Sequence, residues 1–301
     1  MLGSRYAATT AGASPGDHGR STSSSTSKTG CDRRARLPGD NAGATSLGTT
    51  PSSRGPGAAA AAPSTAPRRN VSCVNDGLLA IAADSSRVAE LATDENTGKR
   101  APSCPEWTVR DLVTHLGYVQ QFWAENVRFA QPDAPWRGDM EPPEPSDLAG
   151  WMRRRTENLL AALREAEAAA PCWTWWGEPR TAGAVARHQV QEAAVHRWDA
   201  ELATGTPAPL AADLAHDGVG EFLEVMLRDA ATGLAGEVVL RSVDTNGEWR
   251  VGEPAGGGSA RIHGTASDLV LMLYGRLPVS DLRTEGDSTL VDALQSALAS
   301  E

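Results

Sequence analysis

Four successive segments of the chain carry apolar residues three or four positions apart, which is the spacing of an amphipathic helix. The first segment begins near Asn75 and continues to Leu91. The next three are expected over Thr108–Ala130, Ser146–Leu163 and Thr181–Thr204. Four consecutive amphipathic helices predict a four-helix bundle.

Local signals mark where these helices begin and end. Thr108 is followed three positions later by Asp111, which is typical of a capping box at a helix start. Gly205 and Pro207 follow the fourth segment and would stop it. The segment Ala101–Trp107 has no helical periodicity, so a loop is expected before the second helix.

Beyond the fourth segment the pattern mixes helix and strand signals. Val238–Val243 and Trp249–Val251 read as strands, and Asn246-Gly247 between them is a strong hairpin signal. The other expected elements are a strand over Ala260–His263 and helices over Asp213–Arg228, Ala266–Tyr274 and Asp287–Ala299. This mixture predicts a separate, smaller α/β domain after a boundary near Gly205–Pro209.

The first seventy residues differ from the rest in composition. They are rich in Ser, Thr, Gly, Ala and Pro and show almost no apolar periodicity, so they cannot form a core of their own. We therefore expect a disordered tail over residues 1–70, the helical bundle over residues 71–205 and the α/β domain over residues 206–301.

Charge and apolar content exclude two classes of partner. Residues 1–70 hold nine basic and three acidic side chains while the whole chain has a formal net charge of −10, so the remainder carries −16. An acidic body disfavours nucleic acid, because phosphate binding needs a basic face. No stretch approaches the roughly 18 apolar residues of a spanning helix, so no membrane is expected. The four cysteines form no C-x-x-C pair, which disfavours a disulfide framework and favours a cytoplasmic location.

The most informative string is H-Q-V-Q-E-A-A-V-H-R-W-D, from His188 to Asp199 in the fourth segment. Glu192 and His196 stand four positions apart in it and share one helix face. That face is expected to point inward, because it also includes Val185, Val195 and Leu202. A buried carboxylate and imidazole are costly unless paired, and a metal ion would pair them. His188 lies about 12 Å of helix rise from His196, too far for both to bind one ion.

His115 is the best candidate for a third ligand, because it lies on the apolar stripe of the second helix. Bundle helices pack roughly 8–10 Å apart, a gap that inward side chains can close around a metal. His115, Glu192 and His196 would then form a His₂Glu metal site with one open position. Asp199, three residues after His196, is placed to orient its imidazole.

Each half of this pattern also has an ordinary structural explanation. A glutamate and a histidine four positions apart on a helix are commonly a surface pair, and a buried histidine is commonly hydrogen-bonded within the core. The tryptophan-rich segment Trp173–Trp176 is either core packing or the wall of a ligand pocket.

Four strings of the chain occur together in one known family. They are P-S-C-P-E-W-T-V-R-D-L-V-T-H-L (Pro102–Leu116), C-W-T-W (Cys172–Trp175), E-A-A-V-H-R-W-D-A-E (Glu192–Glu201) and G-T-A-S-D-L-V-L-M-L-Y-G-R-L-P (Gly264–Pro278). In them the chain resembles the mycothiol-dependent maleylpyruvate isomerase family. Departures from the family pattern at Glu106, His188 and Gln191 remove no metal ligand.

The resemblance implies a DinB-like four-helix bundle that binds a divalent metal, usually zinc, and a smaller α/β domain similar to sterol-carrier folds. The metal ligands of the family match His115, Glu192 and His196. It also implies mycothiol, a sugar-linked cysteine cofactor whose thiol would be held as a thiolate and attack an electrophilic small molecule, in an isomerisation or a thiol transfer. Arg241 and Arg261 are candidates for holding substrate carboxylates.

Two other functions fit the same residues. A metal-dependent hydrolase would activate water in the open position and need no thiol. A non-catalytic binding module would use a closed metal site to stabilise its fold.

Overall fold

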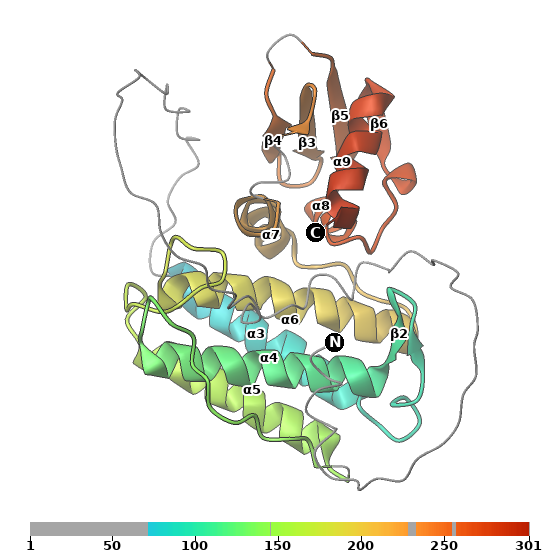
Figure 1. Cartoon of the computed structure of the whole chain (residues 1–301). Helices are drawn as coiled ribbons and strands as arrows, with labels where there is room; N and C mark the ends of the chain where they lie inside the picture. Colours follow the sequence, from blue (N-terminus) through green and yellow to red (C-terminus); the bar gives the residue numbers. More distant parts are fainter. Residues whose placement is uncertain (1–71, 145, 228–232, 255–256, 301) are drawn as a thin grey trace, which may run out of the picture.

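The computed structural model describes residues 72–144, 146–227, 233–254 and 257–300. Within them the chain forms a bundle of four long helices with a smaller α/β unit along one side (Figure 1). The expected fold class, a helical bundle followed by a small sheet domain, is confirmed. The expected tail over residues 1–70 lies outside the described residues, and the division into domains at residue 205 stays a prediction.

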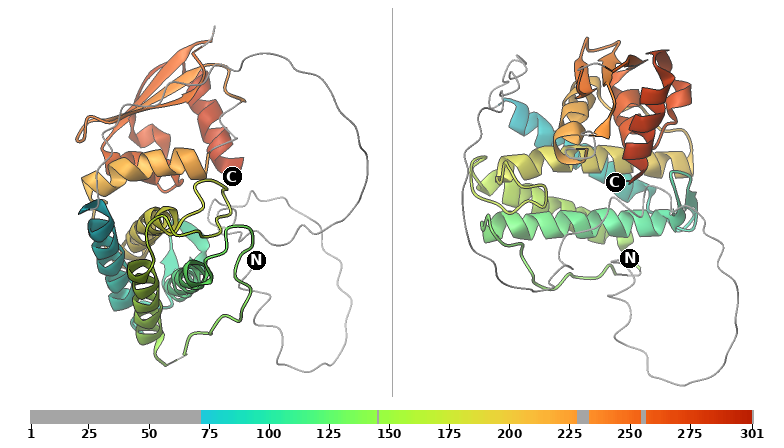
Figure 2. Two further views of the ribbon diagram at one scale, coloured as in Figure 1. Left: turned by 90° about the vertical axis from the view of Figure 1, so that its left-hand side faces the viewer. Right: turned by 45° about the horizontal axis from the view of Figure 1, so that its top comes forward.

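The bundle consists of α3 (Ser72–Leu91), α4 (Val109–Phe129), α5 (Leu148–Glu165) and α6 (Ala182–Thr204). Each helix begins and ends within a few residues of its expected segment. α4 packs on α5 and α3 packs on α6, and contacts of α3 with α5 and of α4 with α6 close the bundle. The left view of Figure 2 shows the four helices around one interior.

Side-chain caps fix where three bundle helices begin. The Thr108 hydroxyl accepts a hydrogen bond from the backbone N–H of Asp111, and the Asp111 carboxylate accepts one from the backbone N–H of Thr108. This is the capping box expected from the sequence. Asp147 and Thr181 cap α5 and α6 through the backbone N–H three residues on. The cap on α4 sets the start of the helix that carries His115 two turns later.

A short hairpin precedes α4, where the sequence suggested a loop over Ala101–Trp107. β1 (Arg100–Ala101) and β2 (Cys104–Thr108) pair antiparallel. Pro102 and Pro105 lack the N–H that a strand ladder uses, so the segment carries no strand signal. Only Arg100 with Thr108 and Ala101 with Cys104 are paired, and β2 leads directly into the first turn of α4.

The smaller unit is a four-stranded sheet in the order β4-β3-β5-β6, in which β3 and β5 are parallel and the other pairs are antiparallel. Its elements are α7 (Ala212–Val225), β3 (Glu237–Ser242), β4 (Glu248–Gly252), β5 (Ser259–Gly264), α8 (Ala266–Leu273), the 3-10 turn η2 (Val279–Asp281), β6 (Arg283–Gly286) and α9 (Ser288–Ser300). The pairing of β3 with β4 confirms the hairpin expected at Asn246-Gly247. The sequence did not predict β6, because all four of its residues are exposed and show no apolar alternation.

Helices cover one face of this sheet. Val238 and Leu240 of β3 and Ala260 and Ile262 of β5 form one core with buried residues of α7, α8 and α9. These strand residues alternate along each strand, as expected for a sheet with one buried face. The left view of Figure 2 shows the helices on the side of the sheet that faces the bundle.

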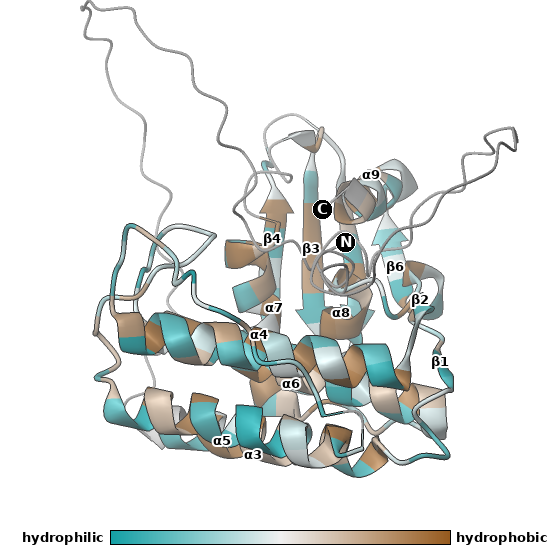
Figure 3. Cartoon of the chain, turned by 60° about the horizontal axis from the view of Figure 1, so that its bottom comes forward, coloured by the Kyte–Doolittle hydropathy of each residue, from teal (hydrophilic) through white to brown (hydrophobic). Residues whose placement is uncertain are grey.

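α6 is the bundle helix that lies against the smaller unit, and it is buried on two sides (Figure 1). Val185 packs in the bundle core, whereas Val195 and Trp198 belong to the core of the smaller unit, with Leu202 packed against it. The expectation that Val195 and Leu202 share the inward face of Glu192 is therefore wrong, because they are turned roughly 60–80° away from it around the helix. Figure 3 shows hydrophobic stretches in β3, β4 and α8 above this helix.

None of the described helices is long and apolar enough to cross a membrane. Two cysteine side chains lie in the described part of the chain. Cys172 is free, and burial raises the pKa of its thiol to about 12. Cys104 is disulfide-bonded, although the spacing of the cysteines disfavours a disulfide framework. The cytoplasmic location therefore stays a prediction.

Candidate metal centre

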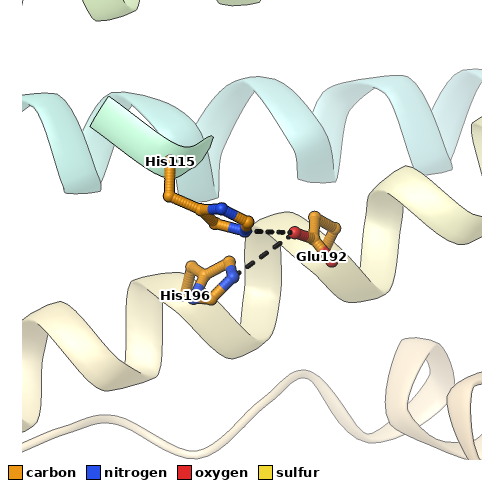
Figure 4. Close-up of side chains that lie close together, drawn as sticks. All are labelled: His115, Glu192 and His196. Carbon is orange, nitrogen blue, oxygen red and sulfur yellow. Dashed lines mark hydrogen bonds and ion pairs between the residues drawn. The ribbon is translucent and has the colours of Figure 1, made fainter. Parts of the chain in front are cut away.

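His115 of α4 and Glu192 and His196 of α6 point toward one another across the bundle interior (Figure 4). Oε1 of Glu192 lies 3.2 Å from Nε2 of His115 and 3.3 Å from Nε2 of His196. The two imidazole centroids are 5.1 Å apart and their planes are nearly perpendicular. One possible ligand atom from each residue lies within 4.8 Å of the other two.

The three side chains differ in charge. Burial lowers the pKa of His115, so its imidazole is neutral near pH 7. Burial opposes the ionisation of Glu192, but hydrogen bonds from the two imidazoles outweigh it and hold the pKa of this carboxyl well below its usual range. Burial also disfavours charge on His196, yet Asp199 and Glu192 together raise its pKa to about 9. The trio is therefore one imidazolium, one carboxylate and one neutral imidazole.

Asp199 orients His196 from behind. One of its oxygens, Oδ2, accepts a hydrogen bond from Nδ1 of His196 at 3.1 Å, which turns Nε2 toward the centre of the trio. Arg276 donates to both carboxylate oxygens, from Nε at 3.1 Å and from a terminal nitrogen at 2.8 Å. The hydroxyl of Ser103 donates to Oδ1 at 2.5 Å. Burial raises the pKa of Asp199, but Arg276 and His196 outweigh it, and the pKa lies well below its usual value.

Trp107, at the end of β2, forms one wall of the site. Its ring centroid lies 4.8 Å from that of His115 and 6.5 Å from that of His196, with the second pair close to parallel. The side chains of His115 and Glu192 keep 18% and 17% of their surface exposed. The side chains of the trio are thus largely but not completely buried.

The chain matches the family model of the mycothiol maleylpyruvate isomerase N-terminal domain over residues 78–201, and the C-terminal domain model of the same family over residues 213–293. Together these two matches include more than half of the chain. The chain belongs to the mycothiol-dependent maleylpyruvate isomerase family.

Two solved structures have a similar fold. They are crystal structures of the mycothiol-dependent maleylpyruvate isomerase and of a histidine-to-alanine variant of it. Each has a TM-score of 0.50 and 17% sequence identity, and the alignment covers 70% of this chain and 92% of that chain. At this identity the likeness shows the DinB-like fold alone. No curated protein matches the chain.

His188 lies apart from the trio of His115, Glu192 and His196, as its helix spacing from His196 predicts. Nδ1 of His188 lies 2.8 Å from Oε1 of Glu221 on α7. The rings of Trp123, Trp175 and Trp176 surround His188 at centroid distances between 5.0 and 6.2 Å. The tryptophan-rich segment therefore packs against a buried histidine.

Arg276 is a residue near the centre that the sequence reasoning missed. Arg241 and Arg261, the arginines singled out from the sequence, lie exposed on β3 and β5, on the sheet face turned away from the helices. Arg276 lies inside the string G-R-L-P, which carries the family resemblance but no helical or strand periodicity that points to Asp199. Its partner Asp199 is 77 positions away along the chain, so no local spacing signals the contact.

Proposed function

We propose that this chain is a metal-dependent, mycothiol-dependent enzyme that acts on an electrophilic small molecule, by isomerisation or by thiol transfer. His115, Glu192 and His196 would hold a divalent metal, and zinc is the expected ion. The observation that supports this is the convergence of two imidazole nitrogens and one carboxylate oxygen from helices distant in sequence. Two nitrogens and one oxygen are a ligand set that catalytic zinc sites use.

The protein residues fit such an ion. His115 is neutral and Glu192 is ionised, so neither has to lose a net proton when it binds the ion. Asp199 holds Nδ1 of His196 and leaves Nε2 to face the same point. The metal would supply a lowered thiol pKa, so that the cofactor is available as a nucleophile near neutral pH. Trp107 shields the two imidazoles on one side while Glu192 and His115 stay partly accessible.

The first experiment measures metal content of the purified protein by elemental analysis. We expect about one divalent ion per chain in the wild type and loss of it in His115→Ala and Glu192→Gln. His263→Ala is the matched control, because the side chain of His263 is 17% exposed, close to the 18% of His115, and lies in β5 of the other domain. Unchanged metal content in His115→Ala would contradict the proposed site.

The second experiment measures consumption of a thiol with a panel of electrophiles, with and without chelator. Thiol consumption that needs the metal supports the proposal. Turnover of esters or amides in thiol-free buffer would instead indicate the hydrolase. Unfolding on chelation, with no turnover of any substrate, would indicate the binding module, because a structural metal stabilises the fold itself.

A further inference from the structure

Arg197 lies beside His196 on α6 but faces away from the metal centre, toward the linker that joins the two domains. Its terminal nitrogens donate to the carbonyl of Ala208 at 2.7 Å and to the carbonyl of Pro209 at 3.2 Å. The side chain is 8% exposed, so these hydrogen bonds are shielded from water. They fold the linker back against the helix that precedes it.

Two acidic side chains fix the guanidinium of Arg197 in this position. Nε donates to Asp84 of α3 at 3.1 Å, and one terminal nitrogen donates to Glu201 at 2.7 Å. Glu201 also accepts a hydrogen bond from the backbone N–H of Ala208 at 3.0 Å. Arg197 therefore binds the backbone carbonyl of Ala208, and Glu201 binds its backbone N–H.

The next residue of the linker continues the connection into the second domain. The backbone N–H of Leu210 donates to Oγ of Ser267 at 2.9 Å, and both side chains are buried. Ser267 is in the first turn of α8, and the chain leaving α8 carries Arg276. Arg276 then returns to α6, where it binds Asp199. These contacts form a closed circuit: they lead from Arg197 through the linker and α8 to Arg276, and back to α6 at Asp199.

We propose that Arg197 is a positioning residue that sets how the second domain meets α6, and thereby how Arg276 holds Asp199 and how Asp199 orients the imidazole of His196. This inference rests on the proposed function, since its consequence is measured at the metal. A guanidinium is required because the geometry uses donors in several directions at once, and an ammonium group offers a single point of charge.

The test compares Arg197→Lys with Arg87→Lys. Arg87 also binds Glu201, at 3.1 Å, but it is 46% exposed and has no described contact with the linker, so it is a matched control. We expect Arg197→Lys to weaken Co²⁺ binding at least tenfold and to shift the visible absorption bands of the bound ion. Arg87→Lys should leave both within a factor of two.

A double-mutant cycle with Arg276→Lys separates positioning from general destabilisation. If Arg197 acts through Arg276, the double variant binds Co²⁺ no more weakly than Arg276→Lys alone, because the second change removes nothing further. Additive losses would overturn the inference, as would wild-type binding in folded Arg197→Lys. If that variant does not fold, Ser267→Ala breaks the next link of the circuit and carries the same expectation.

Hydrogen exchange in the metal-free protein tests the linker directly. The amides of Ala208 and Leu210 should exchange at least tenfold faster in Arg197→Lys and at the wild-type rate in Arg87→Lys. Unchanged exchange in Arg197→Lys would overturn the inference. Failure of the wild type to bind Co²⁺ would overturn the proposed function and the inference with it, whereas wild-type binding with no effect of Arg197→Lys would overturn the inference alone.

Discussion

One carboxylate oxygen of Glu192 lies between two imidazoles that carry different charges. His115 is neutral near pH 7, while the raised pKa of His196, about 9, leaves it protonated in the metal-free protein. A ligand nitrogen must give up its proton before it binds a metal. His196 is therefore the group that couples metal uptake to pH.

We expect metal binding at pH 7.5 to release about one proton, and the apparent affinity to rise about tenfold per pH unit up to about pH 9. Calorimetric titration in buffers of different ionisation enthalpy measures this proton. Asp199→Asn removes the charge that raises the pKa of His196, so that variant should release less than the wild type at pH 7.5. Uptake without proton release in the wild type would contradict the charge assignment.

The sequence predicted the residues of the trio but not those that support them. His115, Glu192 and His196 stand at helical spacing on faces that can be inferred from periodicity. Asp199 was predicted as the orienting group because it is three positions from His196. Arg276 and Ser103 reach Asp199 only through the docking of separate elements, which periodicity does not describe.

At the scale of the element, Gly117 is a position where α4 packs tightly against a side chain of α5. A Cβ added there would lie 2.1 Å from the ring of Trp151, which is fully buried. The indole is part of a buried core cluster between α3, α4 and α5, so moving it would disturb other packed side chains. The helix that carries His115 therefore needs a glycine two positions after it.

We expect Gly117→Ala to destabilise the protein by about 2 kcal/mol in urea unfolding. Overpacking at this distance costs about 3 kcal/mol, which exceeds the gain of about 1 kcal/mol from alanine in a helix. Gly98→Ala is the control, because an added Cβ there meets nothing within 4 Å, and its effect should stay within about 0.5 kcal/mol. Equal stability of the two variants would show that the Trp151 ring can move.

The four bundle helices could be predicted because each has a cap and a long apolar stripe. The hairpin of β1 and β2 could not, since Pro102 and Pro105 remove the usual strand signal. β6 could not either, because an exposed edge strand has no buried face to impose alternation. Strands that are fixed by tertiary pairing alone leave little trace in the sequence.

At the scale of the whole molecule, His188 and Glu221 form a buried ion pair between α6 and α7. Burial disfavours charge on the imidazole, but the carboxylate of Glu221 outweighs it and raises the pKa of His188. An imidazolium with a raised pKa stabilises the folded state fully below the unfolded value of about 6.5, and this contribution is lost as the pH rises through the folded pKa.

We expect the free energy of unfolding of the wild type to exceed that of His188→Gln by the largest amount at pH 6. The difference between the two proteins should shrink as the pH rises toward 9. Urea unfolding of both proteins across this range, with the metal removed, measures the difference, and the titration of His196 cancels because both proteins contain it. His216→Gln is the control, because His216 bonds the neutral hydroxyl of Thr245. A pH-independent difference between wild type and His188→Gln would contradict the assigned charge.

The sequence predicted two units but not how they join. The sequence pattern predicts that Val195 and Leu202 face the metal, but they pack against the smaller α/β unit. A helix buried on two sides has two apolar stripes, and periodicity alone does not say which partner each stripe meets. The placement of Arg276 at Asp199 depends on that choice.

The double burial of α6 also limits how this chain can be recombined. A shortened protein ending after Thr204 would present Val195 and Trp198 to solvent, along a seam that the second half normally covers. A different second half, fused to change the substrate range, would have to reproduce the apolar contacts with Val195 and Trp198. It would also have to supply a cation that binds Asp199 in place of Arg276. Changing the side chains around His115, Glu192 and His196 therefore requires fewer compensating changes than exchanging the whole second half.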